Sequence, residues 1–317
     1  MKIRISEDLE ECQRLWSMNS PACLFDMWMV REAFALSFHR KPFFIVAEQG
    51  GKVSGLLPLC WIEESQCFGY FPGETWRGKT WLEQNKVWAS GHKTVRALLE
   101  AVPVPAHLRY MPPEPWHSNE ERVCEDEVGY LFFPPRYKYD SQRYWQEFSG
   151  KSRKQLAKEM AALTSKGLSF RHDHLPDATV MFRMSLESFW EYSYFKDARF
   201  LASFETLISR LHGNGLRITT ALLGGKIAAV DVGAVWNNTY TVLAGGTHRD
   251  FPGVAKLINF HHLDWACEKR FDSVDFLCGD FGWKRRFHLT ARPLYKIRLR
   301  APDAFEHAPA FQNLVYA

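Results

Sequence analysis

Two stretches of this sequence match each other: Ala-Glu-Gln-Gly-Gly-Lys-Val-Ser-Gly at 47–55 and Ala-Leu-Leu-Gly-Gly-Lys-Ile-Ala-Ala at 221–229. Each places Gly-Gly between two apolar runs, which is typical of a β-hairpin with a two-residue turn. The two stretches begin 174 residues apart (221 minus 47), close to the size of one ordinary domain. Gly-Gly hairpins are common, so chance is the alternative explanation. The spacing favours duplication and predicts two similarly built halves.

The length and composition agree with two packed domains. The chain has 317 residues, of which 46% are hydrophobic and 24% charged, as in ordinary soluble proteins. Prolines cluster between 102 and 117, and Pro134-Pro135 follows, so we predict a boundary within 134–150. The predicted domains are residues 1–145 and 146–317.

Charge and cysteine usage narrow the functional class. The net charge of +4 comes from 40 cations and 36 anions, too small a surplus to predict nucleic-acid binding. The seven cysteines form no CxxC pair, which favours free thiols over disulfides or zinc. The N-terminal residues do not resemble a signal peptide, and no apolar run is long enough for membrane insertion. We therefore expect a cytoplasmic protein without a metal.

The first half shows fewer clear elements than the second. Ser6 is placed to open a helix over 6–17, and strands are predicted at 43–48 and 53–62. The stretch 102–117 is predicted to be loop-rich. No helix opened by a glycine loop is predicted after these strands, so we expect this half to lack a cofactor site and to shape an acceptor cleft with its aromatic residues.

The second half has a regular order of elements. Apolar spacing predicts helices at 152–166, 178–195, 203–211 and 254–270, and strands at 216–223, 227–235, 240–244, 273–277 and 294–299. Hairpin connections make the first three strands antiparallel, and the last long helix crosses to the next strand. The prediction is an α/β (α+β) fold with a mixed, mainly antiparallel sheet flanked by helices.

Several short motifs resemble one known superfamily. They are Ser152-Arg153-Lys154, Gly224-Gly225-Lys226-Ile227-Ala228-Ala229, Pro252-Gly253, and Asp275-Phe276-Leu277-Cys278-Gly279-Asp280 followed by Lys284. Together they resemble the GNAT acetyltransferases, and in particular the two-domain BioF2-like or CelD-like branch related to the Fem peptidyltransferases. The resemblance implies tandem GNAT-like domains and an acyltransferase that uses acetyl-CoA or another acyl-CoA.

The resemblance also implies where the donor binds. The pantetheine arm would run along Leu243, Ala244 and Gly245, and the pyrophosphate would lie at Arg249, Gly253, Val254 and Ala255. A helix N-terminus independently favours anions because its first N–H groups are free and its dipole is positive there. The family loop has the form Arg/Gln-x-x-Gly-x-Gly/Ala, and this chain matches only its final pair, Gly253 and Ala255.

Direct transfer needs a base for the acceptor and an acid for the leaving thiolate. The candidate bases are Asp280, just beyond a strand, and Asp231 within one; Tyr295 is the candidate acid. Strand alternation favours a solvated carboxylate as the alternative for Asp231. Lys284 and Arg285 are candidates to hold an anionic substrate or a cofactor phosphate.

Three functions follow from this pattern. The first is an N- or O-acyltransferase, acting on a small molecule or a polysaccharide precursor. The second is a Fem-like aminoacyl or peptidyl transferase that takes its donor from aminoacyl-tRNA. The third is a binding module that has kept the fold without the activity. The sequence does not predict the acceptor, the acyl chain or the oligomeric state.

Overall fold

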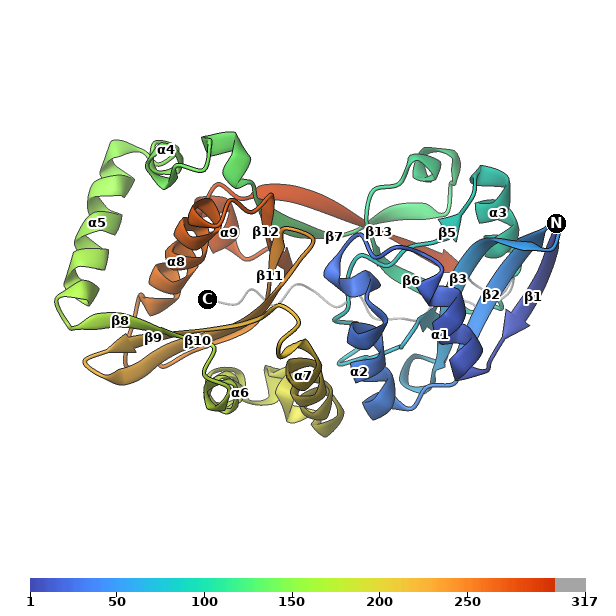
Figure 1. Ribbon diagram of the computed structural model, residues 1–317, viewed down its shortest axis with the longest axis horizontal. Helices are drawn as coiled ribbons and strands as arrows, with labels where there is room; N and C mark the ends of the chain where they lie inside the picture. The colour runs from blue at the N-terminus through green and yellow to red at the C-terminus, as the bar shows by residue number, and fades with distance from the viewer. Residues whose placement is uncertain (300–317) are drawn as a thin grey trace, which may run out of the picture.

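The computed structural model describes residues 1–299, in which thirteen strands form one continuous sheet that spans two lobes (Figure 1). Its order is β1-β2-β3-β4-β6-β13-β7-β12-β11-β10-β9-β8, with β5 paired to β3. The sheet is mixed and mainly antiparallel, with helices against it, as predicted. The predicted second domain extends to 317, and its last residues lie outside the described part.

The helices and strands have the following bounds. The helices are α1 (Leu9–Ser17), α2 (Trp28–Phe38), α3 (His92–Glu100), α4 (Ser141–Trp145), α5 (Gly150–Thr164), α6 (Pro176–Phe189), α7 (Ala198–Leu211), α8 (Val254–Glu268) and α9 (Gly282–Arg286). The strands are β1 (Lys2–Ser6), β2 (Pro42–Gln49), β3 (Lys52–Ile62), β4 (Cys67–Tyr70), β5 (Trp88–Ala89), β6 (Ala106–Met111), β7 (Val123–Phe132), β8 (Leu168–His172), β9 (Leu216–Leu223), β10 (Lys226–Trp236), β11 (Thr239–Thr247), β12 (Ser273–Cys278) and β13 (Thr290–Leu299).

The two Gly-Gly hairpins have the same geometry. Gly50 and Gly51, between β2 and β3, have φ of 58° and 75°, and Gly224 and Gly225, between β9 and β10, have φ of 56° and 77°. Positive φ at both central residues defines the type I′ turn, which matches the twist of the strands it joins. The prediction of a hairpin in each half is confirmed.

The first half contains elements that the sequence pattern missed. Residues 2–6 form β1, so Ser6 ends a strand, and the Asp8 side chain caps α1 by accepting from the Glu11 N–H. The proline-rich stretch contains the strand β6. Gly91 opens α3 after the short β5, so a helix does follow these strands. Short segments lack enough residues to show a period, which is why these predictions were wrong.

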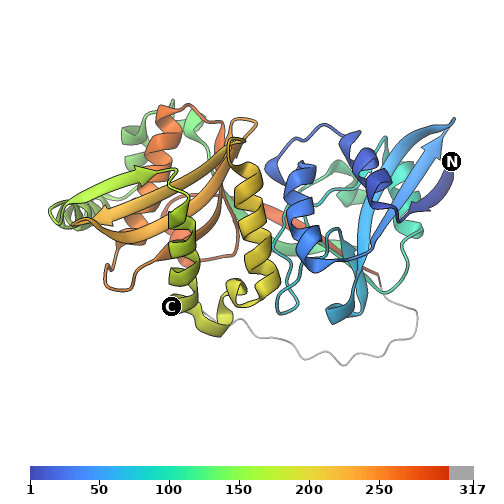
Figure 2. The same ribbon diagram turned by 60° about the horizontal axis from the view of Figure 1, so that its bottom comes forward.

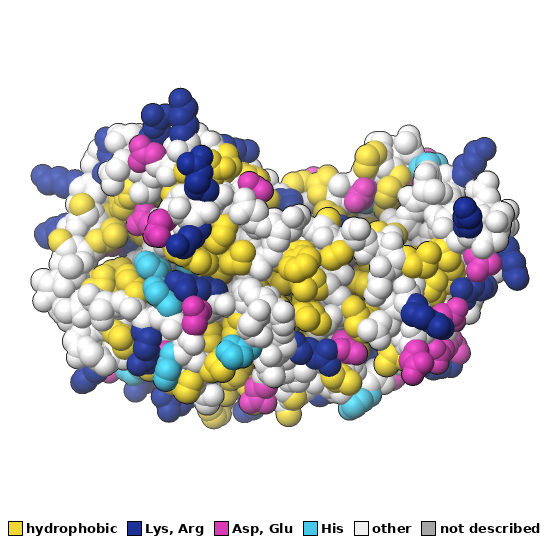
Figure 3. Space-filling model, viewed as in Figure 1, with side chains coloured by type: hydrophobic (Ala, Val, Ile, Leu, Met, Phe, Trp, Pro, Cys, Tyr) yellow, Lys and Arg dark blue, Asp and Glu magenta, His cyan; other side chains and the backbone are white. Residues whose placement is uncertain are grey.

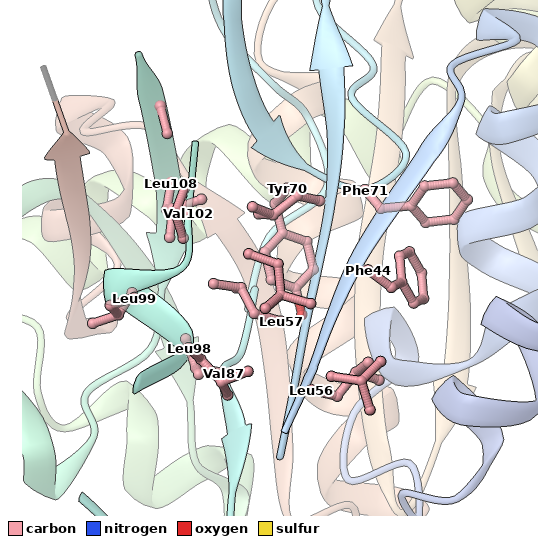
Figure 4. Close-up of a cluster of buried hydrophobic side chains, with 14 of the residues drawn as sticks. Phe44, Leu56, Leu57, Tyr70, Phe71, Val87, Leu98, Leu99, Val102 and Leu108 are labelled. Atoms are coloured by element: carbon pink, nitrogen blue, oxygen red, sulfur yellow. The ribbon is translucent and has the colours of Figure 1, made fainter. Parts of the chain in front are cut away.

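The first half contains a hydrophobic core to which Ile297 and Leu299 of β13 also contribute. In the first half, side chains of β2, β3 and β4 meet those of α3 and β6, including Phe44, Leu57, Tyr70, Leu98 and Leu108 (Figure 4). All five are at most 5% exposed, and burial of this kind is the main stabilising contribution to a fold.

A further core joins the halves. Phe34 of α2 lies edge-on to Phe204 of α7 at 5.8 Å between ring centroids, and Trp81 of the 71–87 loop lies 4.7 Å from Phe204. The adjacent helices α2 and α7 are visible at the junction (Figure 2). Hydrophobic side chains also gather between the lobes on the face shown in Figure 3. This apolar contact fixes the 71–87 loop beside the second half.

The halves also share their strands. Strand β13 pairs with β6 of the first half, where Ile297 lies opposite Leu108, and with β7, where Thr290 lies opposite Leu131. Strand β7 in turn pairs with β12. Each half of the sheet therefore depends on residues that are far away in the sequence.

In the second half the sheet is covered on both faces. Met181 of α6 and Phe204 of α7 pack with Val230 and Val232 of β10 on one face, while α8 packs on the other face (Figure 1). Among the described residues, no helix has the length and apolar character needed to cross a bilayer.

Candidate functional site

Strands β11 and β12 are parallel neighbours that separate along their length. They pair only at Thr239 with Ser273, Tyr240 with Val274 and Thr241 with Asp275. Beyond that point β11 continues to Thr247 and β12 to Cys278 without further pairing between them. The backbone edge of β11 from Val242 onward is therefore open to a ligand that can supply hydrogen bonds.

The buried ammonium of Lys284 holds the end of β12. Its Nζ donates to the carbonyl oxygens of Phe276, Leu277 and Cys278 at 2.8, 2.9 and 2.8 Å. Leu277 has φ of 58°, so the strand turns there. Burial lowers the pKa of Lys284. The prediction that Lys284 holds an anionic substrate is wrong, because its three N–H groups are already used.

The first turn of α8 is open at its N-terminus. Gly253 has φ of 89° and provides no side chain to cap the helix. The Val254 and Lys256 N–H groups donate to the carbonyl oxygens of Phe251 and Gly253 at 3.2 and 3.1 Å, whereas the Ala255 N–H has no acceptor among the described residues. Val254 is buried at 1% exposure and anchors the turn, while Ala255 is exposed. The Arg249 side chain is 93% exposed. This end of the helix can accept an anion.

The residues of β11 that are predicted to bind the acyl donor divide into two groups. Leu243 and Ala244 are buried, with side chains in the core against α6 and α7. Gly245 is exposed, at the part of β11 that β12 has left. The structure thus brings Gly245 to the open edge, whereas the two apolar side chains serve the core and leave only their backbone to a ligand.

Asp231 lies on the α8 face of β10, opposite Gly245 in the pairing with β11. It is 6% exposed, and its Oδ2 lies 2.8 Å from Nε2 of His262, which is completely buried. The expectation of a solvated carboxylate is therefore wrong. Alternation fails here because both faces of this sheet are covered, so the face opposite Val230 and Val232 is also interior.

The other predicted catalytic residues lie apart. Asp280 follows β12, accepts from Tyr130 Oη and is 3.1 Å from Arg285 Nη2, with half of its side chain exposed. Tyr295 lies in β13 opposite Met111, with its ring 4.9 Å from that of His117. The structure does not bring Tyr295 together with Asp231 or Asp280; its neighbours are those of the first-half core.

Glu83, from the first half, reaches the end of β12. Its Oε1 accepts from the Cys278 N–H at 2.6 Å, and its Oε2 lies 3.6 Å from Arg292 Nη2. Oε2 is buried and has no hydrogen bond. Burial, and then the nearby Asp275 carboxylate, raise the pKa of Glu83 to about 7. No motif marks Glu83 in the sequence, because its setting is created by residues about two hundred positions away.

A buried polar cluster fixes the loop that carries Glu83. Asp275 on β12 accepts from Gln84 Nε2 at 3.0 Å, from Arg292 Nη1 at 2.9 Å and from the Leu277 N–H at 2.9 Å. A carboxylate with three such donors is fully satisfied. The first half is thereby tied to the strand end where β11 and β12 separate.

The histidines near this site stack on aromatic rings or pair with a carboxylate. His261 stacks on Phe170 at 3.8 Å and on His172 at 5.3 Å, and His174 pairs with Asp177. Within residues 1–299, no three His, Cys, Asp or Glu side chains are grouped so that they could hold a metal ion.

A mixed sheet whose parallel central pair separates beside an open helix N-terminus defines the GNAT class of folds. Residues 150–285 match the family model described as "Acetyltransferase (GNAT) domain". Residues 150–285 are therefore similar to GNAT acetyltransferases, and the chain has a GNAT-like fold. No curated protein sequence matches it.

Three solved structures share this fold over nearly the whole chain. FemX has a TM-score of 0.57 at 9% identity, covering 94% of this chain and 98% of its own. L-PGS from Bacillus licheniformis has a TM-score of 0.55 at 10% identity, with 94% and 93% covered. A tandem GNAT protein from the clavulanic acid biosynthesis pathway has a TM-score of 0.50 at 12% identity, with 96% and 100% covered. At these identities the likeness establishes the fold.

Proposed function

We propose that this protein is an acyltransferase that moves an acyl group, in the first instance acetyl, from an acyl-CoA to an amine or hydroxyl acceptor. The observation that carries the proposal is the separation of β11 from β12 after three residue pairs, beside the open N-terminus of α8. An extended arm with amide groups fits the free strand edge, and a pyrophosphate fits the helix end.

The donor is proposed to lie along Leu243, Ala244 and Gly245, bound through their backbone, with its pyrophosphate at Gly253, Val254 and Ala255. Arg249 is proposed to add a charge-assisted hydrogen bond, because its side chain is 93% exposed and its one ion pair, with the neighbouring Asp250, is long at 3.9 Å. The loop matches the superfamily pattern imperfectly, but the Ala255 N–H has no acceptor among the described residues and is proposed to donate to the pyrophosphate.

The acceptor is proposed to approach from the junction of the halves, where Glu83 is the base. A buried carboxylate oxygen without a donor is costly unless a ligand supplies one, and Glu83 Oε2 is such an atom. We place Glu83 ahead of Asp280, because Asp280 is already bound by Tyr130 and Arg285.

In the proposed step, the acceptor nitrogen or oxygen forms a bond to the thioester carbonyl carbon as Glu83 takes its proton. The carbon–sulfur bond breaks, and the leaving thiolate takes up a proton from solvent. The acceptor class, a small molecule or a polysaccharide precursor, remains a proposal. So does a cytoplasmic location, which the seven free cysteines support.

The test is a thermal-shift titration with acetyl-CoA, desulfo-CoA and longer acyl-CoAs. Ligand at about one hundred times its Kd should add about 2.7 kcal/mol and raise Tm by about four degrees. A saturable shift supports the proposal. No shift with any acyl-CoA would contradict it and favour either an aminoacyl-tRNA donor or a binding module without catalysis.

The matched variants are Ala255→Glu and Ala162→Glu. Both positions are exposed on helices, but only Ala255 lies in the first turn of α8. A new carboxylate at Ala255 should repel the pyrophosphate, so the shift should be lost there and retained in Ala162→Glu.

A further inference from the structure

Asp231 and His262 form a buried pair whose purpose the fold alone does not explain. His262 is 0% exposed, and its Nδ1 has no hydrogen-bond partner. Its Nε2 has one, the Oδ2 of Asp231 at 2.8 Å. Burying a histidine and a carboxylate for a single hydrogen bond is costly. The histidine's one polar contact therefore serves to hold the carboxylate in place.

The other oxygen of Asp231 is turned toward the open part of β11. A Cβ built on Gly245 would lie 2.2 Å from Asp231 Oδ1, so the carboxylate occupies the space that any side chain at 245 would fill. Asp231 Oδ1 takes part in no hydrogen bond with the described residues. Because Gly245 is exposed and unpaired with β12, a ligand on this strand edge would reach Oδ1 directly.

We propose that Asp231 contacts the acyl donor by accepting a hydrogen bond from one of its N–H groups, and that His262 is the residue that positions Asp231. The inference rests on the proposed function. An ionised carboxylate only accepts hydrogen bonds, so its partner must carry a donor. The pantetheine arm of an acyl-CoA provides amide N–H groups, and an aminoacyl ester provides an ammonium.

The pair lies on the α8 face of the sheet, whereas Asp275, which anchors the loop of Glu83, lies on the face of α6 and α7. Val274 and Phe276, its neighbours in β12, pack with the α8 face. The two carboxylates thus approach the separated strands from opposite sides. In this arrangement Asp231 contacts the acyl donor and Glu83 contacts the molecule that accepts the acyl group. Asp231 is not required to transfer a proton.

The experiment measures the Kd of desulfo-CoA by calorimetry in the full-length protein. Asp231→Asn keeps the shape but removes the charge, and binding should weaken about tenfold or more. Gly245→Ala should weaken binding similarly, because its methyl group displaces the carboxylate. Gly150→Ala is its control, since a Cβ there meets nothing within 4 Å. Unchanged affinity in Asp231→Asn with an intact fold would overturn the inference.

The role of His262 is tested by replacing its side chain, which supplies the N–H group that holds Asp231. His262→Leu should raise the Kd of desulfo-CoA, and His262→Gln, whose side-chain amide can still donate to Asp231, should restore much of the affinity. His261→Gln is the matched control, because His261 stacks on Phe170 and does not contact Asp231. Equal effects of the His261 and His262 changes would contradict a positioning role.

A measurement on the unaltered protein remains decisive if Asp231→Asn does not fold. The ring ¹⁵N signals of His262 should shift when desulfo-CoA binds, while those of His261 change little. A bound complex without that shift overturns the inference. If the unaltered protein binds desulfo-CoA and only the Asp231 results fail, the proposed function stands; if it binds no acyl-CoA, the proposed function itself fails. A response to an aminoacyl ester alone would contradict the acyl-CoA assignment.

Discussion

Glu83 Oε1 accepts a hydrogen bond from the backbone N–H of Cys278 at 2.6 Å, across 195 residues of sequence. One residue belongs to a loop of the first half, and the other ends β12 of the second. The contact places a carboxyl group with a pKa of about 7 at the point where the sheet opens. The two halves therefore build the candidate site jointly.

Glu83→Gln should abolish most of the acyl transfer and remove the acidic limb of its pH profile. A base with a raised pKa is active only when ionised, so the rate in the unaltered protein should rise through about pH 7. General-base catalysis contributes about 10² to 10⁴-fold, which sets the expected loss. The measurement is kcat/KM between pH 5 and 9.

Glu74→Gln is the control for that change. Glu74 lies in the same loop, its pKa is also raised to about 7 by burial, and it accepts from the N–H groups of Trp81 and Leu82. This change should disturb the loop without moving the acidic limb of the profile. A retained limb in Glu83→Gln would rule out Glu83 as the base.

Glu83→Gln also has a predicted effect on the free energy of unfolding. Because the folded pKa of Glu83 is above the unfolded value, its contribution is fully present below about pH 4.3 and is lost as pH rises through about 7. Glu83→Gln removes this loss. Relative to the unaltered protein, the variant should gain stability between pH 5 and 8 in urea unfolding. A constant difference across that range would contradict the raised pKa.

Lys284→Met should destabilise the protein by about 3 kcal/mol or more, because three buried carbonyl oxygens lose their donor. Arg285→Met is the matched control, since Arg285 is 67% exposed and should change stability by about 0.5 kcal/mol or less. The measurement is the free energy of unfolding in urea. Similar small effects at both positions would contradict the anchoring role of Lys284.

Arg31→Lys should loosen the loop that presents Glu83. Arg31 is 1% exposed and donates to the carbonyl oxygens of Phe25, Phe71 and Glu83 at 2.8, 3.4 and 3.2 Å. Lysine carries one compact ammonium and cannot span these acceptors as a planar guanidinium does. Amide hydrogen exchange over 71–87 should become faster, with kcat reduced. Arg96→Lys, an exposed change, should leave both unaltered.

A fragment of residues 146–317 should not fold by itself. It contains β12 and β13 but lacks β7, the strand that lies between them. Restoring β7 in a fragment of residues 120–317 should recover part of the structure. Circular dichroism and cooperative unfolding distinguish the outcomes. A cooperatively folded 146–317 fragment would contradict the shared-sheet organisation and support independent domains.

The sequence by itself determined the local framework. The two Gly-Gly hairpins, the long helices of the second half and the start of α8 at Val254 all follow from turn chemistry and periodicity within short windows. The GNAT-like fold was indicated by the resemblance of short motifs to a known family, and the same resemblance proposed Gly245, Gly253 and Ala255 as donor-binding residues. Short strands such as β1 and β6 were missed because they carry too few residues to show a pattern.

Only the tertiary structure decided the setting of the polar groups. Asp231 is buried because α8 covers the face that alternation assigned to solvent, and Lys284 is buried because the end of β12 folds back over it. Glu83 becomes part of the site because α2 packs against α7 and because strands of one half pair with strands of the other. Burial, pairing and pKa depend on neighbours brought together by folding, and no window of sequence contains those neighbours.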